Sequence, residues 1–172
     1  MMTRLPHQSW LESQGARRVL AALDAEGGET RIVGGAVRDT LLGLPVQDVD
    51  MATRFLPEEV MRRLEAAGIK AIPTGIEHGT ITAVANHQPF EVTTLRRDVT
   101  TDGRRATVAF TDDWKEDAAR RDFTINALFA NPLTGEIFDY FGGLADLEER
   151  RVRFIGQPLE RIRALFEQQA SA

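Results

Sequence analysis

The sequence predicts an α/β domain built on a mixed, largely antiparallel sheet of about five strands, with helices packed against one face. Short apolar runs bounded by turn residues supply the strands. Two of these runs, residues 80–85 and 89–95, flank the turn Asn86-His87-Gln88, which indicates an antiparallel hairpin. Longer runs with apolar residues at helical spacing supply the helices. A chain of 172 residues is long enough for one well-packed domain, or for one domain and part of a second.

The elements follow from local signals along the chain. Pro57 with two acidic residues after it begins one helix and Gly68 ends it, while Asp112 and Asp113 begin another. Between Arg96 and Asp113 the periodicity is lost and the sequence turns polar, which predicts a mobile loop. Helices are predicted at residues 8–23, 36–42, 57–67, 114–128 and 144–151. Strands are predicted at residues 30–33, 48–51, 69–73, 80–85 and 89–95, with a further short strand at 152–155.

The overall composition is that of a soluble globular protein, with 42% hydrophobic and 27% charged residues. The absence of cysteine excludes a disulfide framework and a thiolate metal site, and fits a reducing compartment. No signal peptide and no apolar run of membrane-spanning length is found. We therefore expect a cytoplasmic protein with no membrane partner. The net charge of −5 argues against a chain that holds a large RNA tightly by itself.

A glycine pair marks the first candidate binding site. Gly34 and Gly35 follow the apolar Ile32-Val33 and open the short helix. Glycines let a phosphate group approach the backbone closely, and the N–H groups of a first helical turn attract anions. Arg38, in that turn, adds a planar guanidinium that matches phosphate oxygens. A simple tight turn is the alternative explanation of the glycines.

Three acidic residues mark a candidate metal site. Alternation along a strand places Asp48 and Asp50 on one face, where the two carboxylates repel each other unless a divalent cation lies between them. A solvated strand face is the alternative. Glu91 has apolar neighbours that suggest a central strand, where an inward acid needs a partner or a metal. If the two strands are adjacent, three carboxylates converge beside the phosphate site, which is the layout of a nucleotidyl-transfer site.

The order of these motifs resembles a known family. Gly-Gly-x-Val-Arg-Asp, then Leu-Leu-Gly, then Asp-x-Asp nine residues after Asp39, is similar to the head-domain signature of the class II tRNA nucleotidyltransferase (CCA-adding enzyme) and bacterial poly(A) polymerase family. The run Arg-Arg-Asp-Phe-Thr-Ile-Asn-Ala at residues 120–127 matches a motif of that family over eight residues. The resemblance implies that Arg121, and with it Asp122 and Asn126, contacts the ribose and triphosphate. It also implies that Glu91 is the third metal-site carboxylate.

The resemblance covers residues 30–163 and implies a division into domains. Residues 1–143 are expected to form the nucleotidyltransferase head, and residues 144–172 the truncated start of a helical neck. The Glu-Asp-x-x-Arg motif with which the family's neck selects the base is absent from this sequence. The final helix is expected to expose an apolar stripe through which the chain could associate with itself, namely Leu159, Ile162, Leu165 and Phe166.

The implied activity is Mg²⁺-dependent transfer of nucleotides from CTP or ATP to the 3′ end of tRNA or another RNA, as CCA addition or as poly(A) addition. Two Mg²⁺ ions would be held by Asp48, Asp50 and Glu91. Loss of the base-selecting motif could leave this activity impaired. Two alternatives remain open at the level of sequence: a small standalone nucleotidyltransferase that modifies a protein or a small molecule, and a remnant that binds NTP without transferring anything.

Overall fold

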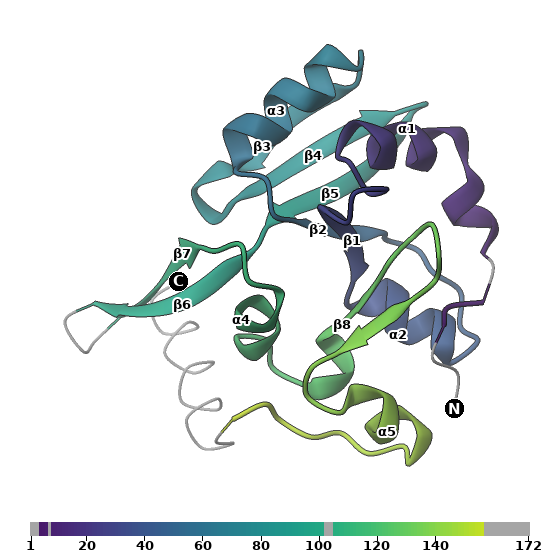
Figure 1. Ribbon diagram of the computed structural model, residues 1–172, viewed down its shortest axis with the longest axis vertical. Helices are drawn as coiled ribbons and strands as arrows, with labels where there is room; N and C mark the ends of the chain where they lie inside the picture. Colours follow the sequence, from purple (N-terminus) through teal and green to yellow (C-terminus); the bar gives the residue numbers. More distant parts are fainter. Residues whose placement is uncertain (1–3, 7, 102–104, 157–172) are drawn as a thin grey trace.

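The computed structural model describes residues 4–6, 8–101 and 105–156. Its main sheet has seven strands in the order β3-β4-β5-β2-β1-β8-β9, and a separate ribbon pairs β6 with β7 (Figure 1). The strands are β1 Thr30–Val33, β2 Asp50–Thr53, β3 Lys70–Gly75, β4 Thr80–Ala85, β5 Gln88–Thr94, β6 Arg96–Thr101, β7 Arg105–Phe110, β8 Leu128–Ala130 and β9 Ile137–Asp139. The helices are α1 Gln14–Ala22, α2 Gly35–Leu41, α3 Pro57–Ala66, α4 Trp114–Ala119 and α5 Gly143–Glu148, with 3₁₀ turns η1 Ser9–Glu12, η2 Ile76–His78 and η3 Thr124–Asn126.

The predicted fold class is confirmed, and the sheet is mixed and mostly antiparallel. Among its neighbouring strands only β2 and β5 run parallel, and this pair lies at the middle of the sheet. The sheet is two strands wider than predicted, because β8 and β9 add to the edge beyond β1. Sequence periodicity placed Leu128 at the end of a helix and assigned residues 129–130 to no element, since three buried apolar residues in a row carry no strand alternation.

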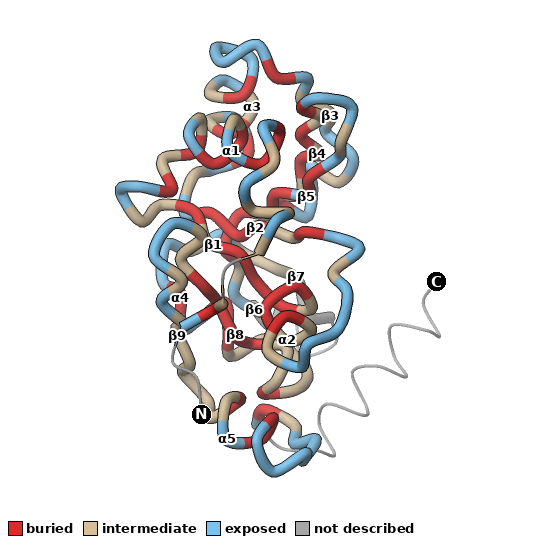
Figure 2. The backbone as a smooth tube through the Cα atoms, turned by 90° about the vertical axis from the view of Figure 1, so that its right-hand side faces the viewer, coloured by how far each residue is buried: buried red, intermediate tan, exposed pale blue. Residues whose placement is uncertain are grey.

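One face of the sheet is covered by α1, α2 and α3, as expected. Val19 from α1, Val37 from α2 and Leu64 from α3 are fully buried in the same cluster as Ile81 and Phe90 of the sheet. The buried residues follow the strands and the helix sides that face them (Figure 2). Burial of apolar area at about 25 cal/mol per Å² makes this cluster the main source of stability.

The opposite face carries a second, smaller core, so the helices are not confined to one face. Trp114 and Ala118 of α4 pack there against Val33, Leu95 and Phe129. The Trp114 and Phe129 rings meet edge-on, with centroids 5.3 Å apart. This core covers only part of the face, and the remainder stays open beside the middle of the sheet.

Three sequence-based element predictions are wrong in detail. The described part of residues 96–110 forms the β6–β7 ribbon and not a mobile loop. The helix predicted at 8–23 is split at Ser13, whose Oγ accepts a hydrogen bond from the Ala16 N–H at 3.2 Å and so begins α1 afresh. The strand predicted at 152–155 is reduced to one isolated bridge between Phe123 and Phe154.

The segment after β9 packs onto the rest of the fold. The Asp139 carboxylate accepts hydrogen bonds from the N–H groups of Gly142, Gly143 and Leu144 and so fixes the start of α5. The predicted boundary at residue 143 between head and neck stays a prediction. The apolar stripe and the self-association predicted from it lie outside the described residues.

Candidate active site

A cleft of about 430 Å³ opens at the middle of the sheet, on the face that α4 partly covers. Its walls come from the residues after β1, from α2, from β2, β4, β5 and β6, and from the chain between α4 and η3. The lining residues are Val33, Gly34, Gly35, Arg38, Asp50, Met51, Thr80, Glu91, Thr93, Arg96, Arg120, Arg121, Asp122 and Asn126. Eight of the nine predicted site residues are in this set, and Asp48 is not.

Gly34 forms the floor of the cleft where β1 passes into α2. Its φ of 72° and ψ of −129° are accessible only to glycine without strain, and its backbone N–H is bonded to the Leu128 carbonyl at 3.1 Å. A methyl group built on Gly34 would point toward an Arg121 guanidinium nitrogen 3.9 Å away. The backbone is therefore bare at the point where an arginine lies above it.

Positive charge in this part of the cleft comes mainly from side chains, because α2 has only seven residues. The Arg38 Nη1 donates to the Asn126 Oδ1 at 2.6 Å, and its Nε donates to the Asp39 carboxylate at 2.9 Å. Asn126 in turn donates to the Asp122 carboxylate at 3.2 Å. This chain of bonds ties α2 to η3 and fixes the Arg38 guanidinium beside the glycines.

Asp50 and Glu91 form the acidic centre of the cleft. They are register partners on the parallel strands β2 and β5, so the predicted adjacency of these strands is confirmed. The pKa of Asp50 is raised to about 6, first because burial disfavours its charged form, and then because the Glu91 carboxyl lies against it. Arg121 acts in the opposite direction, but more weakly. Two carboxyls in this position repel each other when both are ionised.

Asp48 does not join them in the cleft. It precedes β2 in an extended segment without ladder partners, and its side chain is exposed. Its charge contributes only a minor part of the rise in the Asp50 pKa. Within the described residues no group of three or more His, Cys, Asp or Glu side chains is arranged to hold a metal ion. The convergence of three carboxylates is thus not seen, because strand pairing fixes Asp50 and Glu91 but not Asp48.

A buried carboxylate that the sequence did not single out organises the arginines. Asp117 of α4 accepts from Arg120 Nε at 3.3 Å, from Arg121 Nη2 at 3.1 Å and from the backbone N–H of Arg96 at 2.9 Å. Burial lowers the pKa of Arg121, and Asp117 partly offsets this effect. The Nε atoms of Arg96 and Arg121 are buried and have no hydrogen-bond partner within the described structure. The two guanidinium groups thus place partly desolvated positive charge beside the cleft.

The helix predicted across residues 114–128 is wrong, and its interruption shapes the cleft. α4 ends at Ala119, and the chain then pairs with residues 153–155 through bonds from Thr124 N to the Arg153 carbonyl and from Ile155 N to the Asp122 carbonyl. In one continuous helix, Arg121 and Asn126 would point about 140° apart. The break lets both line the same cleft.

The decisive comparison is with a family profile. The poly A polymerase head domain matches residues 30–153, which include all the cleft residues. The chain belongs to the poly A polymerase head domain family.

Similar proteins are longer than this head domain chain. Mouse mitochondrial CCA tRNA nucleotidyltransferase 1 is 48% identical over 163 residues, which are 94% of this chain and 37% of the mouse protein. The crystal structure of the Bacillus stearothermophilus CCA-adding enzyme in complex with CTP aligns with a TM-score of 0.73 and 37% identity, over 91% of this chain and 38% of that one. A tRNA nucleotidyltransferase complexed with a primer tRNA and an incoming ATP analog aligns with a TM-score of 0.60 and 33% identity, over 81% and 39%. The chain thus spans less than two-fifths of these proteins.

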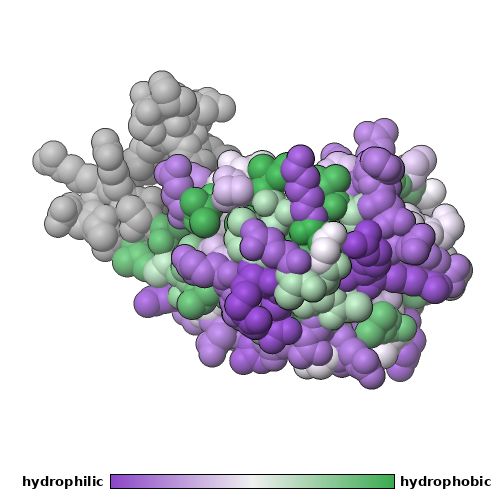
Figure 3. All heavy atoms as spheres, turned by 90° about the horizontal axis from the view of Figure 1, so that it is seen from above, coloured by the Kyte–Doolittle hydropathy of each residue, from purple (hydrophilic) through white to green (hydrophobic). Residues whose placement is uncertain are grey.

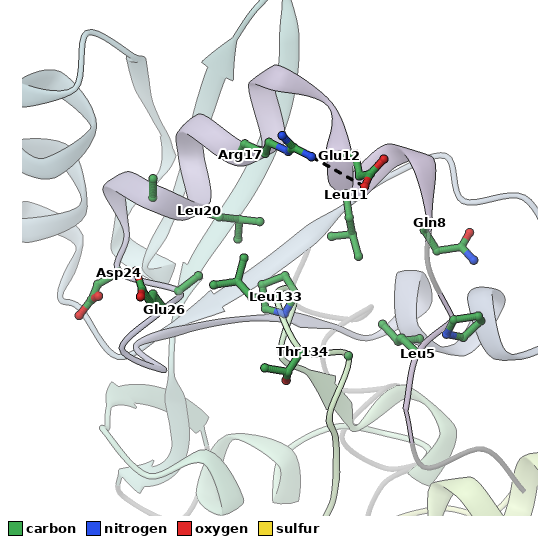
Figure 4. A pocket seen from close by; sticks show the side chains of 15 residues that line it. Leu5, Gln8, Leu11, Glu12, Arg17, Leu20, Asp24, Glu26, Leu133 and Thr134 are labelled. Atoms are coloured by element: carbon green, nitrogen blue, oxygen red, sulfur yellow. Dashed lines mark ion pairs between the residues drawn. The ribbon is translucent and has the colours of Figure 1, made fainter.

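The head domain has a second, larger hollow of about 570 Å³ between α1, the N-terminal segment and the turn that joins β8 to β9 (Figure 4). Its walls are mainly apolar, with Leu11, Leu20 and Leu133 facing the space. Glu12 and Arg17 form an exposed ion pair at 3.7 Å on its rim. The hollow is lined by one arginine, whereas the cleft is lined by four, so size alone does not identify the functional site.

Within the described part of the head domain, no helix is long and apolar enough to cross a membrane.

Proposed function

We propose that this head domain transfers nucleotides from CTP or ATP to the 3′ end of tRNA or another RNA. The observation that carries the proposal is the Asp50–Glu91 pair between bare glycine backbone and buried arginines. The relatives named above include a CCA-adding enzyme with CTP and a nucleotidyltransferase with tRNA and an ATP analog, which supports the same substrates here. The relatives are named as a CCA tRNA nucleotidyltransferase, a CCA-adding enzyme and a tRNA nucleotidyltransferase, which supports CCA addition over poly(A) addition.

The cleft residues fit divalent cations and a triphosphate. The pKa of Asp50 is raised by burial and by repulsion from Glu91, and a bound cation would offset both effects by favouring the ionised carboxylates. Asp50 and Glu91 would hold two Mg²⁺ ions, with Asp48 as the third ligand if its segment moves inward. When bound, Mg²⁺ supplies a lowered pKa for the attacking hydroxyl and charge stabilisation for the leaving pyrophosphate.

The other cleft residues bind and orient the NTP. Gly34 and Gly35 let the triphosphate lie against the backbone, while Arg38 and Arg121 donate to its oxygens. Asn126, held by Asp122, keeps Arg38 in position and faces the ribose. The RNA 3′-hydroxyl gives up its proton to water as its oxygen bonds to the α-phosphorus, the bond from that phosphorus to the oxygen bridging it to the β-phosphate breaks, and pyrophosphate leaves. No protein nucleophile takes part. The predicted cytoplasmic location stays part of the proposal.

A transfer assay tests the proposal directly. The 172-residue chain is incubated with each α-labelled NTP and Mg²⁺, together with tRNA that lacks its CCA end or with a protein extract. Label on the RNA supports the proposal. Label on protein would favour a standalone nucleotidyltransferase, and binding without transfer would indicate an NTP-binding remnant.

A further inference from the structure

The strand order divides the cleft into two sides. β4, β5, β2 and β1 lie next to one another in the sheet, so Asp50 and Glu91 on the central pair have β1 on one side and β4 on the other. Gly34 follows β1, and Arg38 and Arg121 lie near it. The β4 side is made by other residues, which the NTP-binding role described above does not use.

The β4 side presents two hydroxyl groups to the cleft. Thr80 and Thr93 are register partners on β4 and β5, and both line the cleft. Their Oγ1 atoms lie 3.2 Å apart, and either atom can be the donor. Hydroxyls that both donate and accept match the hydroxyls of a ribose better than they match a triphosphate.

An exposed aromatic ring lies against the residue that precedes Thr80. Phe110, at the end of β7, is the register partner of Arg96, so both side chains project from the same face of the ribbon. Arg96 lines the cleft. The Phe110 ring lies directly on Gly79, where an added Cβ would be 2.7 Å from the ring Cε1, and Gly79 precedes Thr80.

Phe110 differs from the other aromatic residues in its exposure. It is 38% exposed, and it is the one aromatic residue among the large hydrophobics exposed in the described part of the chain. The others contribute to the two cores or are at least partly covered. An exposed ring beside a cationic cleft is the usual stacking platform for a nucleic-acid base, because every base offers a π-face.

The chemistry indicates which base this ring would meet. In an in-line displacement, the attacking and leaving oxygens lie on opposite sides of the phosphorus. With the triphosphate on the side of Gly34, Arg38 and Arg121, the attacking hydroxyl must arrive from the side of Thr80 and Thr93.

We propose that Thr80, Thr93 and Phe110 form the acceptor subsite, in which the terminal base of the RNA stacks on Phe110 and its ribose is bound by the threonine hydroxyls. This inference rests on the proposed function, since it takes the acceptor to be an RNA 3′ end. The subsite positions the attacking 3′-hydroxyl toward Asp50 and Glu91.

The stacking contact is tested with a single-stranded RNA whose 3′-terminal base is 2-aminopurine, whose fluorescence is quenched by stacking. In the presence of Mg²⁺ and a non-hydrolysable ATP analogue, the parent chain should quench this base. Phe110→Leu should abolish the quenching and raise the Kd of the RNA about tenfold, since stacking on an aromatic ring contributes about 1–3 kcal/mol per base. Phe110→Trp should restore both. Leu133→Ala, which removes an exposed side chain at the second hollow, is the control and should behave as the parent.

The hydroxyl contacts are tested with matched threonine pairs. Thr93→Val removes a hydroxyl from the cleft, whereas Thr74→Val breaks the similar Thr74–Thr82 pair, 2.9 Å apart, which does not line the cleft. Thr93→Val should raise the KM for RNA several-fold and leave the KM for NTP unchanged. Thr74→Val should change neither constant.

Several outcomes would overturn the acceptor subsite. Equal quenching by the parent and Phe110→Leu, no quenching by the parent, or the same signal from 2-aminopurine at the 5′ end would each do so. A loss of NTP affinity in Phe110→Leu would assign the ring to the incoming base. These results are distinct from a failure of the proposed function, which is measured by label transfer to RNA from the unchanged chain. If Phe110→Leu transfers nucleotides to RNA as well as the parent does, the proposed function would stand and the proposed acceptor subsite would be contradicted.

Discussion

The ionised form of Asp50 destabilises the folded protein, so the free energy of unfolding depends on pH. Its pKa rises from 3.8 to about 6 because of burial and the neighbouring Glu91. Between these two pKa values the folded chain binds more protons at this group than the unfolded chain does. The stability of the metal-free protein should therefore fall as pH rises from about 4 to beyond 6, and stay low above that range.

Asp50→Asn should remove this dependence. In the presence of a chelator at pH 8, the variant should be more stable than the parent by up to about 2 kcal/mol, allowing for partial exposure of the cleft. At pH 4 the two should unfold at nearly the same denaturant concentration. The same substitution should abolish nucleotidyl transfer, because it removes a proposed metal ligand. Urea unfolding at both pH values and a transfer assay measure these effects.

Asp48→Asn provides the control for that experiment. Asp48 is exposed and contributes little to the raised pKa of Asp50. The metal-free stability of Asp48→Asn should therefore differ from that of the parent much less than the stability of Asp50→Asn does. Mg²⁺ with NTP should raise the melting temperature of the parent by mass action but not that of Asp50→Asn. An Asp50→Asn variant that transfers nucleotides at the parent's rate would contradict the metal assignment.

Arg121 allows the geometry of the guanidinium group to be tested at constant charge. Its guanidinium is held by Asp117 at 3.1 Å and lies above Gly34. Arg121→Lys keeps the charge but loses the planar pair of donors, so the affinity for Mg²⁺–ATP should fall about tenfold, or by about 1.4 kcal/mol. Titration calorimetry measures this change. Arg97→Lys, at an exposed position of β6 outside the cleft, should bind ATP as the parent does.

At the scale of elements, one buried carboxylate attaches α5 and the chain after it to η3, which forms part of the cleft wall. Asp146 is fully buried and accepts hydrogen bonds from Thr124 of η3 and from the Nε atoms of Arg151 and Arg153, at 2.9 and 3.2 Å. Burial alone would raise its pKa, but these donors together lower it. The segment that follows the predicted head–neck boundary thus contacts the same 3₁₀ turn that supplies Asn126.

Asp146→Asn should loosen this attachment. The buried donors would lose a charged acceptor, and the free energy of unfolding should fall by about 1–3 kcal/mol at pH 7. Since the folded-state pKa is lowered, the contribution is present above the unfolded pKa of about 3.9 and is lost as pH falls through the folded value. The difference between parent and variant should therefore shrink in urea unfolding below about pH 4. Glu149→Gln, which removes an exposed ion pair to Arg151 at 3.1 Å, should change stability by less than about 0.5 kcal/mol.

The elements that sequence predicts well are those fixed by local chemistry. Pro57 begins α3, Gly68 follows its end with φ of 73°, and Asn86-His87 adopts positive φ at the hairpin turn. The missed elements depend on distant partners. α4 stops at Ala119 because residues 153–155 pair with the chain beyond it. In the β6–β7 ribbon, none of the side chains whose burial the structure describes, at residues 96–99 and 108–110, is buried, so no alternating pattern marks these positions.

The candidate site divides in the same way. The glycine pair and the two arginines stand out in the sequence because their residue types and spacing are unusual. Thr80, Thr93 and Asp117 do not, since a threonine on a strand or an aspartate in a helix has no distinctive local pattern. Their places in the site follow from the pairing of β5 with both β2 and β4 and from the packing of α4.

At the scale of the whole molecule, the charge of the chain is not that of a general RNA-binding surface. The net charge is −5, and the surface seen from above is mostly hydrophilic with scattered hydrophobic side chains (Figure 3). Four arginines from α2, β6 and the chain after α4 instead line the cleft, namely Arg38, Arg96, Arg120 and Arg121. This distribution favours a small polyanion such as a triphosphate over a long nucleic-acid duplex.

The same distribution predicts little discrimination among bases. The cleft offers glycine backbone, guanidinium groups, carboxylates and hydroxyls, which address the phosphates, ribose and cations common to all NTPs. Asn126 and Asp122 could read a base edge, but Asn126 already accepts from Arg38 and donates to Asp122. We therefore expect the 172-residue chain to bind ATP, CTP, GTP and UTP with similar affinity in the presence of Mg²⁺, and to complete CCA on tRNA poorly. Calorimetric titration of the four nucleotides measures this. A preference for CTP and ATP above about tenfold, or about 1.4 kcal/mol, would show that base selection resides in these residues.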